Sequence, residues 1–419
     1  MFDERISRGL IEESNGRLTK AHEEDLDCLC SQLERRGVQT DRVIRQARKF
    51  SVALPSWGFS QGGTRFGRFP ARSEPRTLDE KMFAAALVND LTGITPRISL
   101  HIPWDTPEKV DATRKLARKL GLKFDAMNSN TFQDQPDQRH SYKFGSLSHT
   151  EPAVRAQAIE HNIRCIEIGE ELGSDALVVW LADGTNFPGQ QNLRRALDRT
   201  IDSLENIYER LPRDWRLLVE YKPFEPAFYA TVINDWGTAL FVCQELGEQA
   251  SCLVDLGHHL PNTNVEQVVA RLIAANRLGG FHFNDSKYAD DDVSSGSIKP
   301  YQLFLIFNEL IDAAHDPLLK SKKPKFNPAY MIDQSHNIKD PIEDLIGSAV
   351  EIHRAYVKAL LINRKTLAYH QNRNDVTMAE RVLKTAFETD VTPLLAEARR
   401  RSGSALDPIL AYRQWREKD

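Results

Sequence analysis

The repeated alternation of short apolar runs with helix-like segments constrains the fold of this chain more than any other feature. Each apolar run ends in polar residues, and an amphipathic segment with helix-capping residues follows it. Thr106 and Pro107, for example, supply a cap and a first-turn proline, and Gly121 ends that segment. The runs are mostly apolar throughout, which is typical of parallel strands covered on both faces. Eight of them can be identified, at residues 52–57, 97–102, 122–127, 175–180, 216–221, 252–257, 280–285 and 329–334.

Eight strand–helix units within roughly 280 residues match the count and length of a (β/α)8 barrel. A doubly wound open sheet is the alternative, but no GxGxxG phosphate-binding turn follows any of the eight runs. We therefore predict an α/β fold with a single (β/α)8 TIM barrel at residues 52–360, which forms the catalytic domain. Residues 1–51 are predicted to form helices before the barrel. Residues 361–419 are predicted to form a helical tail that contacts another subunit.

Composition and charge argue against several classes of protein. The formal net charge is −4, so no strong electrostatic field favours nucleic acid or a membrane surface. No apolar run approaches the ~20 residues that a membrane-spanning helix needs, and the charged first ten residues lack the apolar core of a signal peptide. An odd number of scattered cysteines indicates reduced thiols, so we predict a cytoplasmic protein. The run Arg399–Arg401 is predicted to be a solvated face, not a nucleic-acid site.

Ionisable residues stand at the ends of the last four predicted strands. These are Glu220, Asp255, His282 and Asp333. Each alone is as readily explained as a helix cap or a packing residue. In a barrel, however, the carboxyl ends of all strands meet at one mouth, so the four side chains converge. Three converging carboxylates repel one another and are costly to desolvate, and a divalent cation removes that cost. The set therefore predicts a metal site.

More residues of ligand type lie beside these four. His258 follows Asp255 by three positions, and Asp290 and Asp292 lie in the loop after the seventh strand. The acidic run could be a solvated turn, but its position predicts a second metal site. Oxygen ligands with one imidazole per site favour Mn²⁺, Mg²⁺ or Co²⁺ over a structural zinc. We predict two divalent ions per chain, Mn²⁺ first, with Co²⁺, Mg²⁺ or Zn²⁺ as alternatives.

Other residues at the barrel mouth suggest a reacting pocket. Lys222 lies two positions after Glu220, on the same face of the strand, where it can donate to a carbonyl oxygen. An ordinary surface lysine is the alternative. His101 ends the second strand and could move a proton, although a packed core histidine is equally possible.

Aromatic residues around the mouth are expected to form the pocket walls, although core packing explains aromatics there equally well. They are Trp57, Phe132 and Trp180. The Gly-rich segment 59–72, which contains Phe66, follows the first strand. It lacks a GxxxxGK[ST] motif, so we predict a mobile lid rather than a phosphate-binding loop.

The combined pattern resembles the xylose-isomerase-like superfamily, and within it the L-rhamnose isomerases of broad specificity. The phrases LVEYKP, LVDLGHH, HFNDSKYADDD and MIDQSHN carry this resemblance, which spans about residues 50–360. It implies a substrate-holding ion bound by Glu220, Asp255, His282 and Asp333. It further implies a second ion bound by His258, Asp290 and Asp292, with Asp255 bridging. A homotetramer in which Phe66 closes a neighbour's pocket is also implied.

The resemblance implies an aldose–ketose isomerase, and we expect L-rhamnose to be converted to L-rhamnulose. His101, Lys222 and Asp333 are the expected catalytic residues: His101 would assist ring opening and Lys222 would stabilise charge on O1. Trp57, Phe66, Phe132 and Trp180 are expected to contact the sugar together with His101 and Lys222. Since every obvious carboxylate is assigned as a ligand, we favour a metal-assisted hydride shift between C2 and C1.

Three other functions compete with this interpretation. A ketose 3-epimerase uses a related one-metal barrel with two opposed glutamate bases, yet the eighth strand here ends in the shorter Asp333. It would also leave His258, Asp290 and Asp292 without a role. A metal-dependent phosphodiester hydrolase should show a basic surface and more histidine ligands. A metal-stabilised binding module would not require Lys222 or His101.

Overall fold

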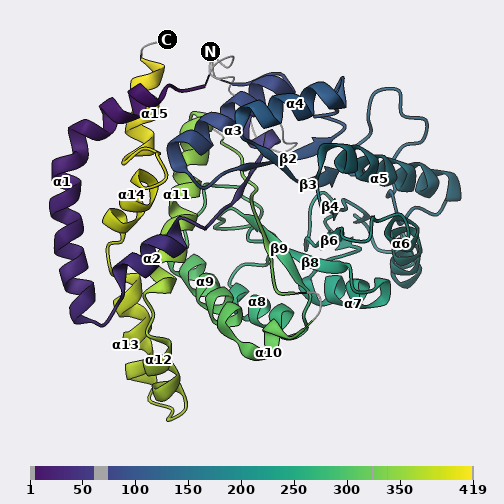
Figure 1. Ribbon diagram of the computed structural model, residues 1–419. Helices are drawn as coiled ribbons and strands as arrows, with labels where there is room; N and C mark the ends of the chain where they lie inside the picture. The colour runs from purple at the N-terminus through teal and green to yellow at the C-terminus, as the bar shows by residue number, and fades with distance from the viewer. Residues whose placement is uncertain (1–4, 61–73, 323–324, 337, 418–419) are drawn as a thin grey trace.

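The computed structural model describes residues 5–60, 74–322, 325–336 and 338–417. In this part of the chain, eight parallel strands close into a barrel in the order β1-β10-β9-β8-β6-β4-β3-β2 (Figure 1). The predicted barrel is confirmed, and each predicted run overlaps one of its strands. Their bounds are β1 (Ala53–Pro55), β2 (Arg97–Ile102), β3 (Lys123–Ser129), β4 (Ala176–Trp180), β6 (Arg216–Glu220), β8 (Ala250–Asp255), β9 (Leu278–Phe283) and β10 (Ala329–Ile332).

Two features of the strands differ from the predicted runs. β1 has only three residues, because the chain turns at Pro55 into the 3₁₀ helix η1 (Ser56–Phe59). A second small sheet pairs β5 (Gly184–Thr185) with β7 (Ala230–Thr231) in antiparallel fashion. Two-residue strands carry no hydrophobic periodicity, so this sheet could not be predicted from the sequence.

Helices surround the barrel and lie between its strands in the chain (Figure 1). Gly121 has φ +70° and ends α4, as its position in the sequence predicts. The predicted start at Thr106 and Pro107 is wrong, because α4 begins at Val110 and the Thr106 hydroxyl donates to the carbonyl oxygen of Pro103 instead. None of the described helices has the length and apolar character needed to cross a bilayer. The helices are α1 (Arg8–Arg35), α2 (Thr40–Ala47), α3 (Leu78–Thr92), α4 (Val110–Leu120), α5 (Pro152–Leu172), α6 (Leu193–Tyr208), α7 (Trp236–Leu246), α8 (Val265–Ala274), α9 (Pro300–His315), α10 (Pro317–Lys320), α11 (Pro341–Leu360), α12 (Arg364–Gln371), α13 (Val376–Phe387), α14 (Thr392–Arg400) and α15 (Pro408–Arg416).

The two ends of the chain pack against each other on one side of the barrel. Figure 1 shows α1 beside α14 and α15, and α14 also contacts α2. Leu394 and Leu395 in the tail are completely buried within this chain. His22 on α1 lies 3.2 Å from the Glu397 carboxylate on α14. These tail residues are therefore already covered, and a contact between the tail and another subunit stays a prediction for the rest of its surface.

The arginine run in the tail corrects one expectation. Arg399 is buried, and its guanidinium donates to the carbonyl oxygens of Ala405 at 2.9 Å and Leu406 at 2.8 Å. Its neighbours Arg400 and Arg401 form ion pairs with Glu397. The prediction of a solvated face is wrong for Arg399, because this side chain satisfies backbone carbonyls of the turn that follows α14.

Candidate active site at the mouth of the barrel

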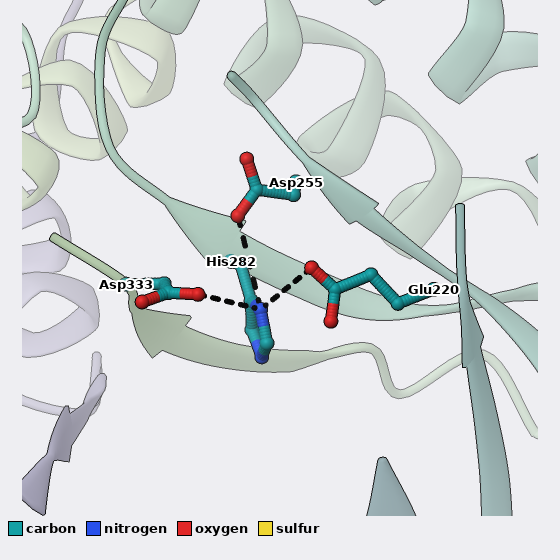
Figure 2. A group of neighbouring side chains, drawn as sticks. All are labelled: Glu220, Asp255, His282 and Asp333. Atoms are coloured by element: carbon teal, nitrogen blue, oxygen red, sulfur yellow. Dashed lines mark hydrogen bonds and ion pairs between the residues drawn. The ribbon is translucent and has the colours of Figure 1, made fainter. Parts of the chain in front are cut away.

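Four ionisable side chains meet at the carboxyl ends of neighbouring strands. Glu220 ends β6, Asp255 ends β8, His282 lies near the end of β9, and Asp333 directly follows β10. One ligand atom from each lies within 4.8 Å of those of the others. Nδ1 of His282 is 3.2 Å from Glu220 Oε1, 3.3 Å from Asp333 Oδ2 and 3.8 Å from Asp255 Oδ2 (Figure 2). We call these four residues the strand-end cluster.

The charges of the strand-end cluster fit a divalent cation. Burial, together with the nearby carboxylates of Glu220 and Asp333, outweighs the opposing effect of His258 and raises the pKa of Asp255 to about 7. Burial lowers the pKa of His282, but Glu220 and Asp333 outweigh it and raise this pKa to about 10. Without a bound ion, the positive charge of protonated His282 therefore offsets part of the negative charge of the neighbouring carboxylates. Three carboxylates and one imidazole are a donor set that Mn²⁺ and similar ions accept.

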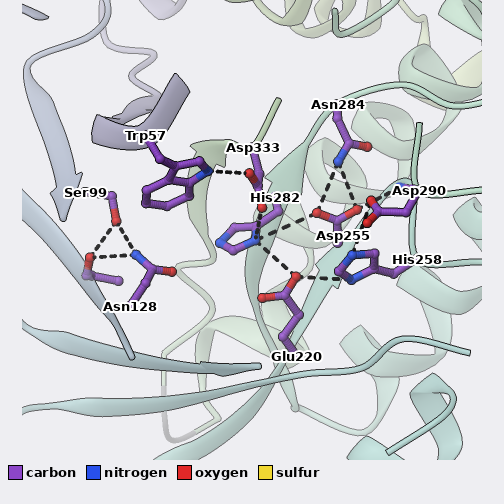
Figure 3. Close-up of polar contacts among 12 residues, drawn as sticks. Trp57, Ser99, Asn128, Glu220, Asp255, His258, His282, Asn284, Asp290 and Asp333 are labelled. Carbon is purple, nitrogen blue, oxygen red and sulfur yellow. Dashed lines mark hydrogen bonds and ion pairs between the residues drawn. The ribbon is translucent and has the colours of Figure 1, made fainter. Parts of the chain in front are cut away.

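A second group adjoins the first and shares Asp255 with it. Ligand atoms of Asp255, His258 and Asp290 also lie within 4.8 Å of one another. His258 Nδ1 is 3.1 Å from Glu220 Oε1, and His258 Nε2 is 3.4 Å from Asp290 Oδ1 (Figure 3). Although burial lowers the pKa of His258, Asp255 and Asp290 raise it well above its usual range. We call Asp255, His258 and Asp290 the loop group.

Asp292, the third predicted ligand of the second ion, lies outside the loop group. It lines the same cavity, and its backbone has φ +46°, in the left-handed region. Burial raises the pKa of Asp292 well above its usual range, and the neighbouring carboxylate of Asp290 raises it further. Asp292 therefore lies beside Asp290, and its role as a ligand of the second ion stays a prediction.

Lys222 enters the cavity beside the loop group. Its Nζ lies 2.5 Å from Asp290 Oδ2, 3.7 Å from Glu225 Oε2 and 5.1 Å from the centre of the Trp180 ring. Burial lowers the pKa of Lys222, but the charge and hydrogen bond of Asp290 outweigh it and raise this pKa. Lys222 is therefore a buried ammonium ion and not an ordinary surface lysine.

Aromatic rings form one wall around His101. The imidazole stacks on Trp104 with ring centres 4.3 Å apart. The rings of Trp57 and Phe132 lie edge-on to it, with ring centres 5.3 and 5.5 Å away. Phe132 in turn contacts Trp180 at 4.6 Å. Burial lowers the pKa of His101 to about 4, so the ring is neutral near pH 7. A neutral imidazole can both donate and accept a proton.

A buried ion pair lies behind this wall. Lys81 Nζ is 2.7 Å from Asp105 Oδ1, and the other carboxylate oxygen accepts the backbone N–H of His101 at 3.0 Å. The hydroxyl of Ser56, next to Trp57, donates to the same oxygen. The Asp105 carboxylate thus connects Ser56 and the backbone of His101 to Lys81 on helix α3.

Three residues with roles in the site were not identified from the sequence. Asn284 Nδ2 donates to both carboxylate oxygens of Asp255, at 2.9 and 3.1 Å (Figure 3). Glu225 lines the cavity and has φ +72°, and Trp104 stacks on His101. Asn284 follows β9 directly, so its position at the end of a predicted strand could have identified it as a site residue.

The cavity at the mouth has a volume of about 920 Å³. Asp255 lies buried beneath it, and Phe66 and most of the predicted lid lie outside the described residues. The other predicted site residues all line it, namely Trp57, His101, Phe132, Trp180, Glu220, Lys222, His258, His282, Asp290, Asp292 and Asp333.

Comparisons with known proteins match this architecture. Residues 85–310 match a family model described as "Xylose isomerase-like TIM barrel". The chain is 54% identical to a "Probable sugar isomerase" of Rhizobium meliloti over 97% of its length and 94% of the relative. It is 53% identical to another of Mesorhizobium japonicum over 99% of its length and 95% of the relative.

More distant matches are weaker. An L-rhamnose isomerase of Bacteroides thetaiotaomicron is 24% identical over 57% of this chain and 61% of that protein. Among solved structures, an L-ribulose 3-epimerase aligns with a TM-score of 0.53 and 13% identity, covering 78% of this chain and 98% of that one. At this identity the structural match shows a common fold and nothing finer.

Proposed function

The chain belongs to the xylose isomerase-like TIM barrel family, and on this premise we propose that it is a metal-dependent sugar isomerase that interconverts an aldose and its ketose. The two relatives of 54% and 53% identity named above carry the description "Probable sugar isomerase" and align over nearly the whole chain. The observation that carries the proposal is one buried cavity that joins the strand-end cluster, the loop group and the ammonium ion of Lys222.

The proposed reaction moves hydrogen between C2 and C1 and a proton between O2 and O1. A divalent ion held by Glu220, Asp255, His282 and Asp333 would polarise the sugar carbonyl and acidify the adjacent hydroxyl. Lys222 stabilises negative charge on O1. His101, neutral and held against Trp104, transfers a proton to or from the ring oxygen as the sugar opens.

Three aromatic residues outside the strand-end cluster also have roles in this proposal. Trp57 donates from Nε1 to Asp333 Oδ1 at 2.7 Å, so it holds this carboxylate in position. Phe132 and Trp180 cover apolar faces of the sugar and exclude water.

Hydride transfer is favoured because the cavity carboxylates already have partners. Glu220 and Asp333 belong to the strand-end cluster, and Asp290 belongs to the loop group. Asp292 lies beside Asp290. Glu225 lies outside these sets, but its carboxylate is an ion-pair partner of Lys222 at 3.7 Å. A proton route through an enediol needs a carboxylate base free to accept the proton from C2. We therefore propose that the hydrogen passes directly from C2 to C1.

An isotope experiment tests the reaction and its route. The metal-loaded protein is incubated with aldose carrying deuterium at C2, and the ketose is analysed by NMR. We expect ketose with the deuterium retained at C1 and little label in the solvent. Extensive loss of label to water would overturn the hydride route. Absence of any ketose with a panel of different aldoses would overturn the proposed isomerase activity.

For the substrate we propose L-rhamnose, as the resemblance of the strand-end motifs implies. The aromatic wall around Trp57 and Phe132 offers an apolar surface for the methyl group of a 6-deoxy sugar. Burying one methyl contributes about 0.8 kcal/mol, or roughly fourfold in specificity. The end held by the polar groups should discriminate more strongly, since a misplaced hydroxyl there leaves buried groups unpaired.

A substrate panel checks this assignment. We expect the highest kcat/KM with L-rhamnose, and lower values by modest factors with L-mannose and L-lyxose. A tenfold lead of D-xylose or D-glucose would contradict the L-rhamnose assignment and leave the isomerase class intact. The alternative, a ketose 3-epimerase, would instead convert ketoses to their C3 epimers without forming aldose. The two Mn²⁺ ions, the homotetramer and the closing role of Phe66 remain predictions from the resemblance.

A further inference from the structure

A second cavity of about 770 Å³ lies between helices and their connections outside the barrel strands. It is bordered by Ile311 and His315 at the end of α9 and by Leu360 at the end of α11. Helices that follow barrel strands run back from the mouth, so their carboxyl ends mark the opposite face. The segments 36–46, 361–366 and 378–385 supply the other walls. This second cavity therefore shares no residue with the candidate active site.

The charges that line the second cavity are strongly one-sided. Among the described residues it is bordered by one carboxylate, that of Asp312, and by five cationic side chains. The protein as a whole carries a net charge of −4, so this concentration runs against its overall sign. Like charges around one concavity repel each other and attract an anion. The five cations are Arg36, Arg42, Arg364, Lys365 and Arg381.

Arg364 has unused hydrogen-bonding capacity. Its Nη1 donates to Asn308 Oδ1 at 2.7 Å and lies 3.6 Å from Asp312 Oδ1. Its Nη2 is buried and has no acceptor among the described residues. Burial also lowers the pKa of this guanidinium. A buried donor without an acceptor destabilises the fold, and an anionic oxygen from a ligand would satisfy it.

The floor of the second cavity is apolar. Val38, Val43, Ile362 and Val382 line it between the cationic side chains. A free inorganic anion would contact the cationic side chains and leave the apolar side chains exposed to water. A ligand with an apolar or flat body and a multiply charged group uses both. The volume lies within the usual range for small-molecule sites.

We propose that the second cavity binds a small organic phosphate. The phosphate is held by Arg364 with Arg42 and Arg381, since guanidinium groups match phosphate oxygens in pairs. The organic body lies on the apolar floor. The competing explanation is that these cations only complement the negative carboxyl ends of α9 and α11, in which case no ligand binds.

Calorimetric titration of the metal-loaded full chain with AMP tests the proposal, with adenosine and inorganic phosphate as partial probes. We expect saturable binding of AMP, weaker by about tenfold or more for each partial probe, and weaker at higher salt. Arg42→Glu/Arg381→Glu should weaken AMP binding by about tenfold or more. The matched control Arg45→Glu/Lys384→Glu carries the same charge change on the same helices, at exposed residues outside the cavity, and should bind normally.

Each contrary result overturns a defined part of the proposal. No saturable binding of AMP at millimolar concentration would overturn the site. Equal binding by the charge-reversed variant and its control would place AMP elsewhere, for example at ions in the mouth. Phosphate binding as tightly as AMP would overturn the role of the apolar floor. Sugar isomerase activity is measured in parallel and should be unchanged in both variants, so failure here leaves the proposed function intact.

Discussion

Asp105 has more influence on the cavity wall than its position outside the ionisable clusters suggests. Its carboxylate accepts from the ammonium of Lys81, the amide of His101 and the hydroxyl of Ser56. All four residues are buried. Loss of the negative charge would leave an ammonium ion buried without a counter-ion, and this is far more destabilising than loss of both charges together.

Substitution Asp105→Asn should therefore destabilise the protein and lower kcat/KM. We expect a loss of about 3–5 kcal/mol in the free energy of unfolding. The double variant Asp105→Asn/Lys81→Met should regain much of this stability, because the unpaired charge is gone. Denaturant unfolding and steady-state kinetics on both variants measure the effect. If the double variant is as unstable as the single one, the buried charge is not the cause.

At the scale of residues, the sequence predicts which side chains gather but not every contact. Glu220, Asp255 and His282 could be found because each ends an apolar run, and the barrel brings strand ends together. Glu225 and Asp292 adopt left-handed backbone conformations in loops. Such conformations depend on tertiary contacts, so the ion pair of Glu225 with Lys222 and the contact of Asp292 with Asp290 could not be derived from spacing.

Among the elements, α11 is joined to the segment before β1 by a buried histidine. The ring of His353 stacks on Phe50 with centres 5.4 Å apart, and its Nε2 lies 3.0 Å from the carbonyl oxygen of Ala47. Burial, with Arg399 nearby, lowers the pKa of His353 to about 3. The folded protein therefore keeps this ring neutral at a pH where the unfolded chain would protonate it.

The packing of α11 should therefore weaken in mild acid. The pKa of His353 is lower in the folded state, so its contribution to stability is complete above pH 6.5 and declines as the pH falls toward 3. One such group changes the free energy of unfolding by about 1.4 kcal/mol per pH unit in this window. We expect His353→Gln to lose less Tm than the wild type between pH 7 and 4.5. The control His140→Gln, at a half-buried loop residue, should follow the wild type.

Long elements could be predicted well, whereas the two-residue strands and the packing of the terminal helices could not. The eight barrel strands appear as continuous apolar runs, and helices such as α4 carry apolar periodicity and a terminal glycine, which indicate their type. The apolar residues of the tail indicated a covered helix face but not the surface that covers it. In the structure α1 and α2 of the same chain cover α14, a contact between segments more than 300 residues apart.

For the whole molecule, the ions should contribute to stability as well as to chemistry. Exhaustive chelation should abolish activity and lower Tm, since a ligand that binds only the folded state stabilises it. Added Mn²⁺ should restore both, with about two ions per chain by elemental analysis, as the two clusters imply. His258→Ala should reduce this to one ion and stop turnover, while Glu225→Gln should still bind the full number.

The contrary outcomes are equally clear. Full turnover by the chelated protein would contradict metal dependence. Normal kcat in His258→Ala would contradict a working role for the loop group. An unchanged Tm after complete removal of the ions would show that the strand-end carboxylates are neutralised by protons alone, as the raised pKa values of Asp255 and His282 allow.

The closure of the barrel has a consequence for the exchange of ions. In its described residues, β1 meets β10 through a single register pair, Ala53 with Met331, whereas β6, β8 and β9 share longer ladders. Local opening begins where the fewest backbone bonds must break. Opening of this seam would draw Trp57 away from Asp333, whereas Asp333 itself stays with β9, which pairs with β10 over four residues. We therefore expect exchange of a bound ion to begin with loss of the contact between Trp57 and Asp333, while the rest of the barrel remains folded.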